Sequence, residues 1–557
     1  MRYTILSIGP LLNTMGQADN TRTLWTASYI FSNLMKDTLM HLFHTQNIKE
    51  NEFVLPAIDK EYFSSGKRAG LFHDRLILRG DKTKEIQDAF DFAIGELVKI
   101  VQKAFKKSNG YKYVKIDFDD NEVEAFVKSY IQSYIVSVDV PNGKSPILYL
   151  SPFVDIAEYE PKLPIHQEKE YLYKFLKIAN LTLNKYFAFL EGAEDGKKDR
   201  CFKSLPEIAS HDFVKDWDKK NKYFCLTINQ MKKLEEKIKS PEWEVDDIYD
   251  ELLKDENIKE KFKPYHKYVA IVQADGDSFA KHLASIGSDE RKLKEFSENI
   301  FKFADGSREI IEKSGGAVII AGGDDLLFFA PVVANGLNIF ELIDKIDEKF
   351  ACTFCKAKGL SMSYGISISY HKFPLQESLA LANRALFGEA KKSKWVNYGY
   401  ALDTLDKDMD ALKLPSKNAI HLNIQKHSGQ SHALTLKKDT ELYELFKKLL
   451  KAELNENEDL HLPHALHHSL KKSEEIIECL EVDSIEHFFT NQFDEDVHKT
   501  THKEALEAVQ EIIKYLKDSD ESCWRLQQDR DKNYFLSKTT QLLFELLSTI
   551  KLLRGDE

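Results

Sequence analysis

One stretch constrains the fold more than any other: GGAVIIAGGDDLLFFAPV, residues 315–332. Two runs rich in β-branched and aromatic residues, which favour strands, flank the tetrad Gly322-Gly323-Asp324-Asp325. Glycine and aspartate are common turn residues. The stretch therefore predicts a hairpin of two buried strands whose tip carries two adjacent carboxylates.

Four further segments surround this hairpin. Strands are predicted at KYVAIVQ (residues 267–273) and LSMSYGISISY (residues 360–370). Apolar residues at helical spacing predict helices over residues 292–313 and 338–350. The resulting order, β-α-β-β-α-β, is that of a ferredoxin-like domain.

This topology predicts where the acidic residues meet. The first two strands are parallel and the third returns between them, so the end of the first strand and the tip of the hairpin share one edge. The first strand ends in ADGD, which contains Asp275, Gly276 and Asp277. We therefore expect the two acidic motifs to be neighbours in space.

Crowded carboxylates need a cation between them, and hard oxygen ligands suit Mg²⁺ or Mn²⁺. Such ions can support nucleotidyl transfer by lowering the pKa of an attacking hydroxyl and stabilising the leaving pyrophosphate. A purely structural acidic turn is the alternative, and the pairing of two motifs disfavours it. The predicted catalytic and metal-binding residues are Asp275, Asp324 and Asp325, with Asp277 a weaker metal ligand, and the predicted nucleotide-binding residues are Gly276, Asp277, Ser278, Gly322 and Gly323.

The sequence pattern divides the chain into four parts. Residues 1–165 open with a strand, YTILSIG, continue with a helix and end in SPILYLSPFVDIA, which predicts one or two strands. Residues 166–262 are helical and then densely charged, which is typical of a solvated face or linker. Residues 263–428 hold both acidic motifs, and residues 429–557 consist of amphipathic helices that predict a bundle.

Composition limits the classes of function. The formal net charge of −12 argues against a free-standing nucleic-acid binder, so partners would hold most of any RNA. Six cysteines with a single CxxC pair are typical of a reducing cytosol. We find no signal peptide and no apolar run of about 18 residues, and expect a cytoplasmic protein without a membrane span.

ADGDSFAKHL followed by GGAVIIAGGDDLLFFAPV resembles the cyclase-type palm in the large subunit of type III CRISPR effector complexes (Cas10 family), closest to the Cmr (type III-B) branch. ILSIGP, TRTLWTASYIFSNLM, CFKSLPEIAS and SYGISISYHKFPLQESLALANRALFGEAKKSK resemble other segments of that family. The resemblance implies an α+β fold with two ferredoxin-like palm domains, the first one degenerate, a helical interdomain region and a C-terminal helical bundle.

The resemblance also implies a function. The palm would bind ATP with two metal ions, with Lys391 near the triphosphate, and target RNA would activate it. Other Cmr-type subunits would carry the guide RNA. The product would be a cyclic oligoadenylate, or AMP joined to S-adenosylmethionine as co-substrate. On residue pattern alone, Lys391 has a second interpretation as a solvated helix end.

Two features of the family are missing. Because the sequence opens directly with the first palm-like segment, we expect no N-terminal HD nuclease domain. The pairs His73-Asp74 and His211-Asp212 lack a histidine-rich context, so we also expect no DNA cleavage. A four-cysteine zinc site is not expected, because a structural zinc needs four ligands and the chain has a single CxxC pair. Two other functions stay open: a catalytically silent scaffold of the complex, and a free-standing nucleotide cyclase.

Overall fold

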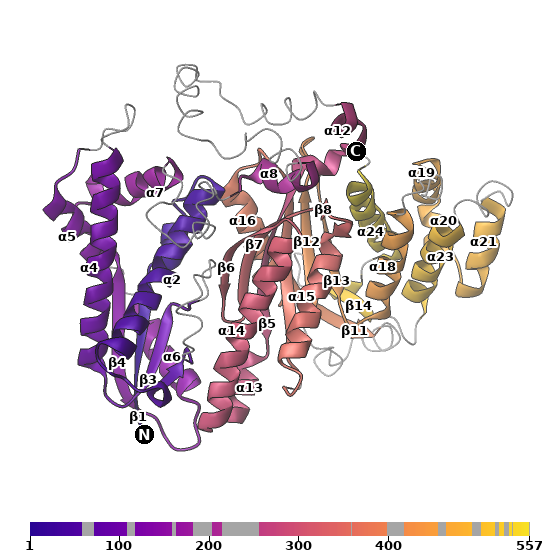
Figure 1. Cartoon of the computed structure of the whole chain (residues 1–557). Helices are drawn as coiled ribbons and strands as arrows, with labels where there is room; N and C mark the ends of the chain where they lie inside the picture. The colour runs from indigo at the N-terminus through magenta and orange to yellow at the C-terminus, as the bar shows by residue number, and fades with distance from the viewer. Residues whose placement is uncertain are drawn as a thin grey trace. The chain divides into compact units, whose positions relative to one another are not determined.

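The computed structural model describes residues 1–57, 72–108, 117–158, 163–181, 203–213, 256–357, 359–397, 417–454, 464–492, 503–518, 523–528, 534–536 and 538–555. Most of the predicted charged linker lies outside these ranges. The chain forms two compact units (Figure 1). Unit 1 comprises Met1–Tyr249, Ser278–Ala330 and Phe340–Leu360, and unit 2 comprises Asp250–Asp277, Pro331–Ile339 and Ser361–Glu557.

Unit 1 contains a four-stranded antiparallel sheet in the order β2-β3-β1-β4. Its central strand β1 is buried from Tyr3 to Ile8, and Tyr3 lies opposite Arg79 on one side and Val138 on the other. Helices α2 and α4 connect the strands in the order β-α-β-β-α-β, which confirms a ferredoxin-like arrangement in this part of the chain. The bounds are β1 Arg2–Gly9, α2 Thr21–His44, β2 Phe53–Leu55, β3 Arg75–Arg79, α4 Thr83–Ser108 and β4 Gln132–Asp139.

Helix α2 is buried along most of its length, because it packs against α4, α7 (Tyr171–Leu181) and β6 (Ala317–Gly322). It begins after Asn20, whose side-chain oxygen accepts hydrogen bonds from the backbone N–H groups of Arg22 and Thr23. The Ser28 hydroxyl donates to the Ile319 carbonyl at 3.1 Å. Through this contact α2 covers one strand of the acidic hairpin.

The prediction of strands at SPILYLSPFVDIA is wrong: Pro146–Glu158 form helix α6, which packs on β1 and β4. Proline is favourable in the first turn of a helix, where its missing N–H costs nothing. Leu150 and Val154, four residues apart, are fully buried, whereas Phe153 between them is 40% exposed. The apolar run therefore has a helical period that its high hydrophobicity conceals.

The acidic hairpin of unit 1 is confirmed. Strand β6 pairs antiparallel with β7 (Asp325–Pro331), and Gly322 lies opposite Asp325. The two predicted helices that flank it are also confirmed, as α14 (Glu290–Lys313) and α15 (Ile339–Thr353). The hairpin strands are buried, so only the tip can hold polar side chains in contact with solvent.

In unit 2 the strands follow the order β13-β12-β10-β5. The predicted strands are confirmed as β5 (Tyr268–Asp277) and β10 (Ser361–Tyr370), which pair antiparallel. Two strands were not predicted from the sequence: β12 (Ala419–Gln425), parallel to β10, and β13 (Ser431–Lys437), antiparallel to β12. The predicted domain boundary at residue 428 falls in the turn between these two strands, and the four-part division of the chain stays a prediction.

The C-terminal part of unit 2 is mainly helical, as predicted, but it also contains short strands. The segment 534–536, predicted as helix, is a strand, because its aromatic residues pair with the strand at 523–528. No helix in the described ranges is long and apolar enough to cross a bilayer. The bounds are β11 Lys394–Asn397, α18 Glu441–Glu453, α19 His464–Lys472, α20 Glu474–Cys479, α21 Ile485–Gln492, α23 Lys503–Lys517, β14 Cys523–Gln528, β15 Tyr534–Leu536 and α24 Thr539–Arg554.

Candidate active site

The first acidic motif lies at the end of β5 in unit 2. The antiparallel register places Asp275 opposite Ser363 and Asp277 opposite Ser361. Residues two apart on a strand project from the same face. Both carboxylates therefore emerge on one face of the sheet, and Gly276 lies between them.

Asp277 is held by three hydrogen bonds. Its Oδ2 accepts from the hydroxyls of Ser361 and Ser363 at 2.9 and 2.8 Å, and from the backbone N–H of Asn418 at 2.9 Å. The side chain is only 2% exposed. Among the described residues, Oδ1 has no hydrogen-bond partner. Asp277 therefore anchors the end of β5 through Oδ2, while its Oδ1 makes no hydrogen bond within the described ranges.

Lys391 contacts both ends of this motif. It follows η5 (Ala385–Ala390), a π-helical turn of the kind that often marks functional sites. Its Nζ donates to Asp275 Oδ2 and to the Gly276 carbonyl, the latter at 3.1 Å, and lies 3.7 Å from Asp277 Oδ1. The structure therefore places Lys391 at the acidic motif and excludes the interpretation as a solvated helix end.

The environment of Lys391 weakens its charge. Its side chain is 13% exposed. Burial, together with the nearby Lys417 ammonium, lowers the pKa of Lys391 to about 7, while the Asp275 carboxylate acts in the opposite direction. Because burial weakens the hold of Lys391 on its proton, a divalent cation can compete with it for the carboxylates.

The second acidic motif is the tip of the hairpin in unit 1. Gly323 has φ +74°, a conformation that glycine adopts without strain. Desolvation, followed by the charges of Asp324 and Asp74, raises the pKa of Asp325 to about 7, although part of the Asp325 surface is exposed. The adjacent carboxylates of Asp324 and Asp325 resist simultaneous ionisation, and a divalent cation would relieve their repulsion.

The sequence pattern did not predict that His73 and Asp74 lie near the hairpin tip. A Cβ added to Gly323 would lie 1.9 Å from His73 Cε1, so the imidazole covers the glycine directly. Burial lowers the pKa of His73, and burial raises that of Asp74. Arg75, the next residue, pairs with Asp155 at 2.6 Å. This HD pair therefore belongs to the surroundings of the acidic hairpin tip.

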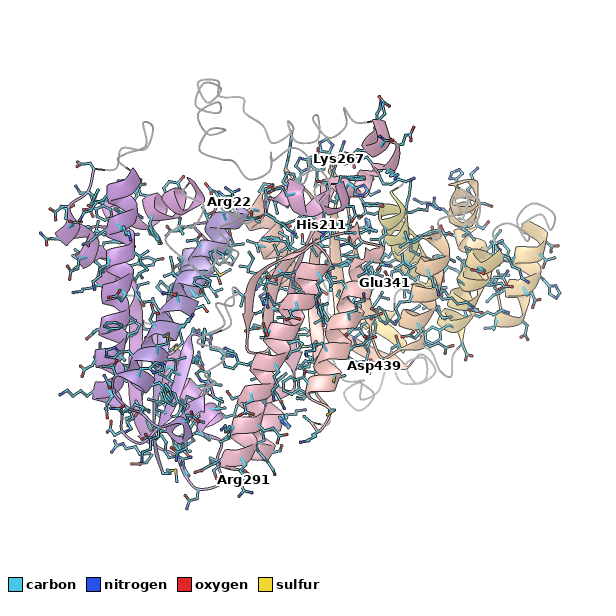
Figure 2. The ribbon with its side chains drawn as sticks, in the orientation of Figure 1. Arg22, His211, Lys267, Arg291, Glu341 and Asp439 are labelled. Atoms are coloured by element: carbon cyan, nitrogen blue, oxygen red, sulfur yellow. The ribbon has the colours of Figure 1, made fainter. Side chains whose placement is uncertain are left out.

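The second HD pair has a structural position. A Cβ on Gly315 would lie 2.4 Å from Cδ2 of His211, the histidine labelled in Figure 2. Cys352 and Cys355, the CxxC pair, are free and exposed.

Ser278 precedes α13 (Phe279–Ile286) in a left-handed conformation, and its side chain makes no capping hydrogen bond. Binding of phosphate there stays a prediction.

The structure thus assembles two groups of predicted residues. Within the ranges that it describes, no three Asp, Glu, His or Cys side chains are arranged to hold a metal ion. The carboxylate oxygens are of the type that Mg²⁺ and Mn²⁺ take, and Lys391 lies where a cation would contact Asp275. The shared site of the two motifs stays a prediction. The groups are Asp275, Gly276, Asp277 and Lys391 in unit 2, and Gly322, Gly323, Asp324 and Asp325 in unit 1.

Comparisons with known proteins identify a related domain and a related fold. Residues 268–397 match the model of the Cas10/Cmr2 family, second palm domain, and this range includes both acidic motifs and Lys391. The fold is similar to a chain of the type III-B Cmr-beta cryo-EM structure in the apo state (11% identity, TM-score 0.60), covering 100% of this chain and 82% of that chain.

A second similar structure is type III-B Cmr-beta bound to cognate target RNA, determined by cryo-EM. The identity is 10% and the TM-score 0.61, and the match covers 99% of this chain and 83% of that chain. At such identities the likeness establishes a shared fold. No curated protein gives a significant match to the sequence.

Proposed function

We propose that this chain, a member of the Cas10 family of large palm-domain subunits, is a nucleotidyltransferase that uses ATP as donor. In this proposal it works inside a type III CRISPR complex and is activated by target RNA. Its output is a nucleotide second messenger.

The cluster at the end of β5 carries this proposal. Three hydrogen bonds fix Asp277, and this fixes the strand end that presents Asp275. Lys391 Nζ donates to Asp275, and burial lowers the pKa of this lysine. A divalent cation at Asp275 would displace this ammonium, which could then donate hydrogen bonds to a triphosphate oxygen.

Each predicted residue then has a role. Asp275, Asp324 and Asp325 would hold Mg²⁺ or Mn²⁺, whose chemistry is to activate the attacking hydroxyl and stabilise the leaving pyrophosphate. The glycines of the hairpin tip leave the backbone accessible to phosphate groups. Ser278 precedes α13, and the first backbone N–H groups of that helix would bind the phosphates. Gly276 and Asp277 complete the nucleotide-binding set.

The acceptor defines the product. Attack by the 3′-hydroxyl of a second ATP on the α-phosphate gives a cyclic oligoadenylate after repeated additions, whereas S-adenosylmethionine as acceptor gives its conjugate with AMP. We place the reaction in the cytoplasm, in a complex with Cmr-type subunits that carry the guide RNA. The net charge of −12 supports this division of labour, because an acidic chain repels nucleic acid unless partners bind it.

One observation favours a second function, that of a silent scaffold. Lys391 already neutralises Asp275 and approaches Asp277, so this motif is electrostatically satisfied without a metal. A retained palm with an internal ion pair would need no further charge. The scaffold makes no product, and this separates it from the enzyme.

The test uses the assembled complex. It is incubated with target RNA, Mn²⁺ or Mg²⁺ and ATP labelled at the α-phosphate, with and without S-adenosylmethionine, and the products are identified by mass spectrometry. We expect a labelled product that depends on target RNA. The double variant Asp324→Ala/Asp325→Ala should make none while the complex still assembles.

A matched control removes two carboxylates elsewhere. Asp88 and Asp91 lie on the exposed face of α4, so Asp88→Ala/Asp91→Ala should leave product formation unchanged. Absence of any product from the wild-type complex under all conditions would favour the scaffold. Product formation by the isolated chain without RNA would favour a free-standing cyclase.

A further inference from the structure

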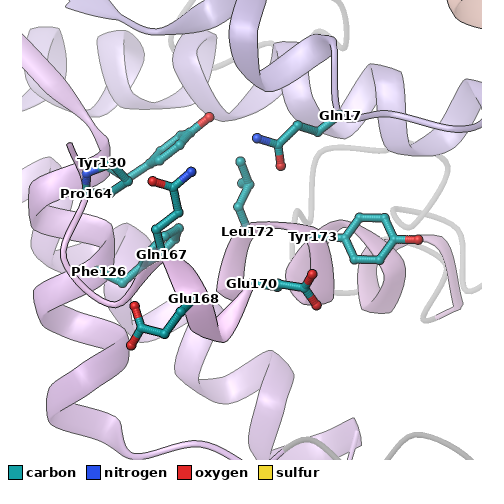
Figure 3. Close-up of a pocket in the computed structure, with 9 residues that line it drawn as sticks. All are labelled: Gln17, Phe126, Tyr130, Pro164, Gln167, Glu168, Glu170, Leu172 and Tyr173. Atoms are coloured by element: carbon teal, nitrogen blue, oxygen red, sulfur yellow. The ribbon is translucent and has the colours of Figure 1, made fainter. Parts of the chain in front are cut away.

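Unit 1 contains a cavity of about 700 Å³ that includes none of the predicted nucleotide-binding residues (Figure 3). It is lined by residues of α5 (Asp120–Tyr130), of α7 and of the segment 163–170, and by Gln17. Its volume lies within the usual range of ligand pockets.

The floor of the cavity is apolar and aromatic. Phe126 and Leu172 are buried at 5% and 8% exposure. The ring of Tyr130 stacks on Phe126 with centroids 5.5 Å apart, and its hydroxyl is fixed 2.7 Å from Thr14 Oγ1. Figure 3 shows the rings of Tyr130 and Tyr173 on either side of Leu172. The cavity therefore offers a rigid aromatic wall and a second aromatic ring.

The rim is acidic. None of the nine described residues that line the cavity carries a positive charge, and the exposed Glu168 and Glu170 carry negative charges. Lys169, between them in sequence, has its Nζ 3.9 Å from Glu122 Oε2. Lys174 donates to the Lys169 carbonyl at 2.6 Å. The nearest lysines in sequence are therefore engaged outside the cavity, and His166 Nδ1 lies 3.6 Å from Glu168 Oε1. The other exposed rim residues are Gln17 and Gln167.

An exposed apolar pair flanks the rim. Leu163 and Ile165 are 86% and 55% exposed on either side of Pro164, which lines the cavity. The backbone N–H of Ile165 donates to Ser129 Oγ at 2.8 Å, so the segment is anchored to α5. Neighbouring large apolar side chains held in solvent are typical of an interaction surface.

We propose that this cavity receives an arginine side chain from a partner protein, with apolar neighbours of that arginine packing on Leu163 and Ile165. A guanidinium stacks on aromatic rings and binds carboxylates with paired hydrogen bonds. Figure 3 shows the Glu170 carboxylate and the Tyr173 ring on the same side of Leu172, so these two groups would receive the guanidinium. Tyr130 forms the aromatic wall behind Leu172, and Glu168 adds negative charge to the rim. Because the whole chain is acidic, a basic segment is also attracted at long range.

The same chemistry disfavours nucleic acid as the occupant. Phosphate groups bind where lysine and arginine are available, and this rim offers two carboxylates and two amides instead. A purely apolar ligand would make no use of these polar rim groups. An arginine flanked by leucine-like residues satisfies the floor, the rim and the exposed pair together.

The test measures binding of two short peptides to the full chain by saturation-transfer NMR. One is acetyl-Leu-Arg-Leu-amide, and the other replaces arginine with citrulline, which has nearly the same shape but no charge. We expect the arginine peptide to bind at least roughly tenfold more tightly than the citrulline peptide, since charge-assisted hydrogen bonds are about twice as strong as neutral ones.

Two double variants locate the preference. Glu168→Gln/Glu170→Gln should remove it, whereas Glu441→Gln/Glu444→Gln, which changes two exposed glutamates of α18, should keep it. Tyr173→Leu should weaken binding of the arginine peptide several-fold. Equal binding of both peptides to the wild type would overturn the proposal, as would a preference retained in Glu168→Gln/Glu170→Gln. Displacement of the arginine peptide by a single-stranded RNA from the same pocket would also overturn it.

Discussion

Replacing Gly323 with alanine tests the packing at the acidic hairpin tip. The φ angle of +74° is unfavourable for alanine, and the new Cβ would lie 1.9 Å from His73 Cε1 and 2.6 Å from Nε2. Gly143 provides a matched control, because its φ is +81° but no atom lies within 4 Å of an added Cβ. The two substitutions share the backbone cost and differ only in the contact with His73.

The magnitude follows from these two contributions. A left-handed alanine costs about 1–2 kcal/mol, and we expect this cost alone for Gly143→Ala. Moving a packed side chain to admit a new carbon adds about 1–3 kcal/mol, so Gly323→Ala should cost about 2–5 kcal/mol in total. In the background His73→Ala the obstacle is gone, and the cost of Gly323→Ala should fall to about 1–2 kcal/mol.

Native-state hydrogen exchange read by mass spectrometry measures these costs locally. Peptides that span residues 317–331 report the hairpin, and peptides that span residues 132–145 report the control. Each loss of about 1.4 kcal/mol lowers protection tenfold. If Gly323→Ala lowers protection no more than Gly143→Ala does, or if His73→Ala brings no relief, the close contact between His73 and Gly323 is refuted.

Three further predictions concern unit 2. Asp277→Ala should lower the free energy of unfolding by about 3 kcal/mol in urea titrations, because three buried donors lose their acceptor; a loss below about 0.5 kcal/mol would contradict the anchoring role. Burial lowers the pKa of His421 to about 4, so the unfolded chain binds more protons between about pH 4 and 6.5 and stability falls as the pH falls through that window. His421→Gln should remove about 1–2 kcal/mol of the stability difference between pH 7 and 5, and an unchanged difference would argue against a buried neutral imidazole. Arg554→Met leaves buried Glu453 without the partner at 2.7 Å and should cost about 3–5 kcal/mol, whereas adding Glu453→Leu should recover part of it in circular-dichroism melts; no recovery would mean that packing dominates.

The elements around the acidic hairpin could be predicted because their local patterns agree with their packing. β5, β6, β7 and β10 are apolar runs bounded by turns, and α14 has a clear apolar stripe. The prediction failed at α6, where an almost continuously apolar segment satisfies both strand and helix patterns. It also missed β12 and β13, whose strand character depends on pairing with β10 and with each other.

The candidate site could be predicted only in part, for a related reason. Clustered aspartates and glycines are visible in sequence, and so was Lys391 through family resemblance. The donors to Asp277 were not visible, because they depend on the register of β10 and on the backbone of Asn418. His73 lies 250 residues from Gly323 in sequence, and nothing local to either residue predicts their contact.

The two acidic motifs are proposed to hold the same divalent cations, and electron paramagnetic resonance titration of Mn²⁺ into the full chain with a non-hydrolysable ATP analogue tests this directly. We predict that Asp275→Ala and Asp324→Ala/Asp325→Ala each abolish high-affinity Mn²⁺ binding, because both motifs contribute ligands to one site. Asp88→Ala/Asp91→Ala should bind as the wild type does. If each motif variant keeps a separate share of the bound Mn²⁺, or if neither changes the titration, the shared metal site is contradicted.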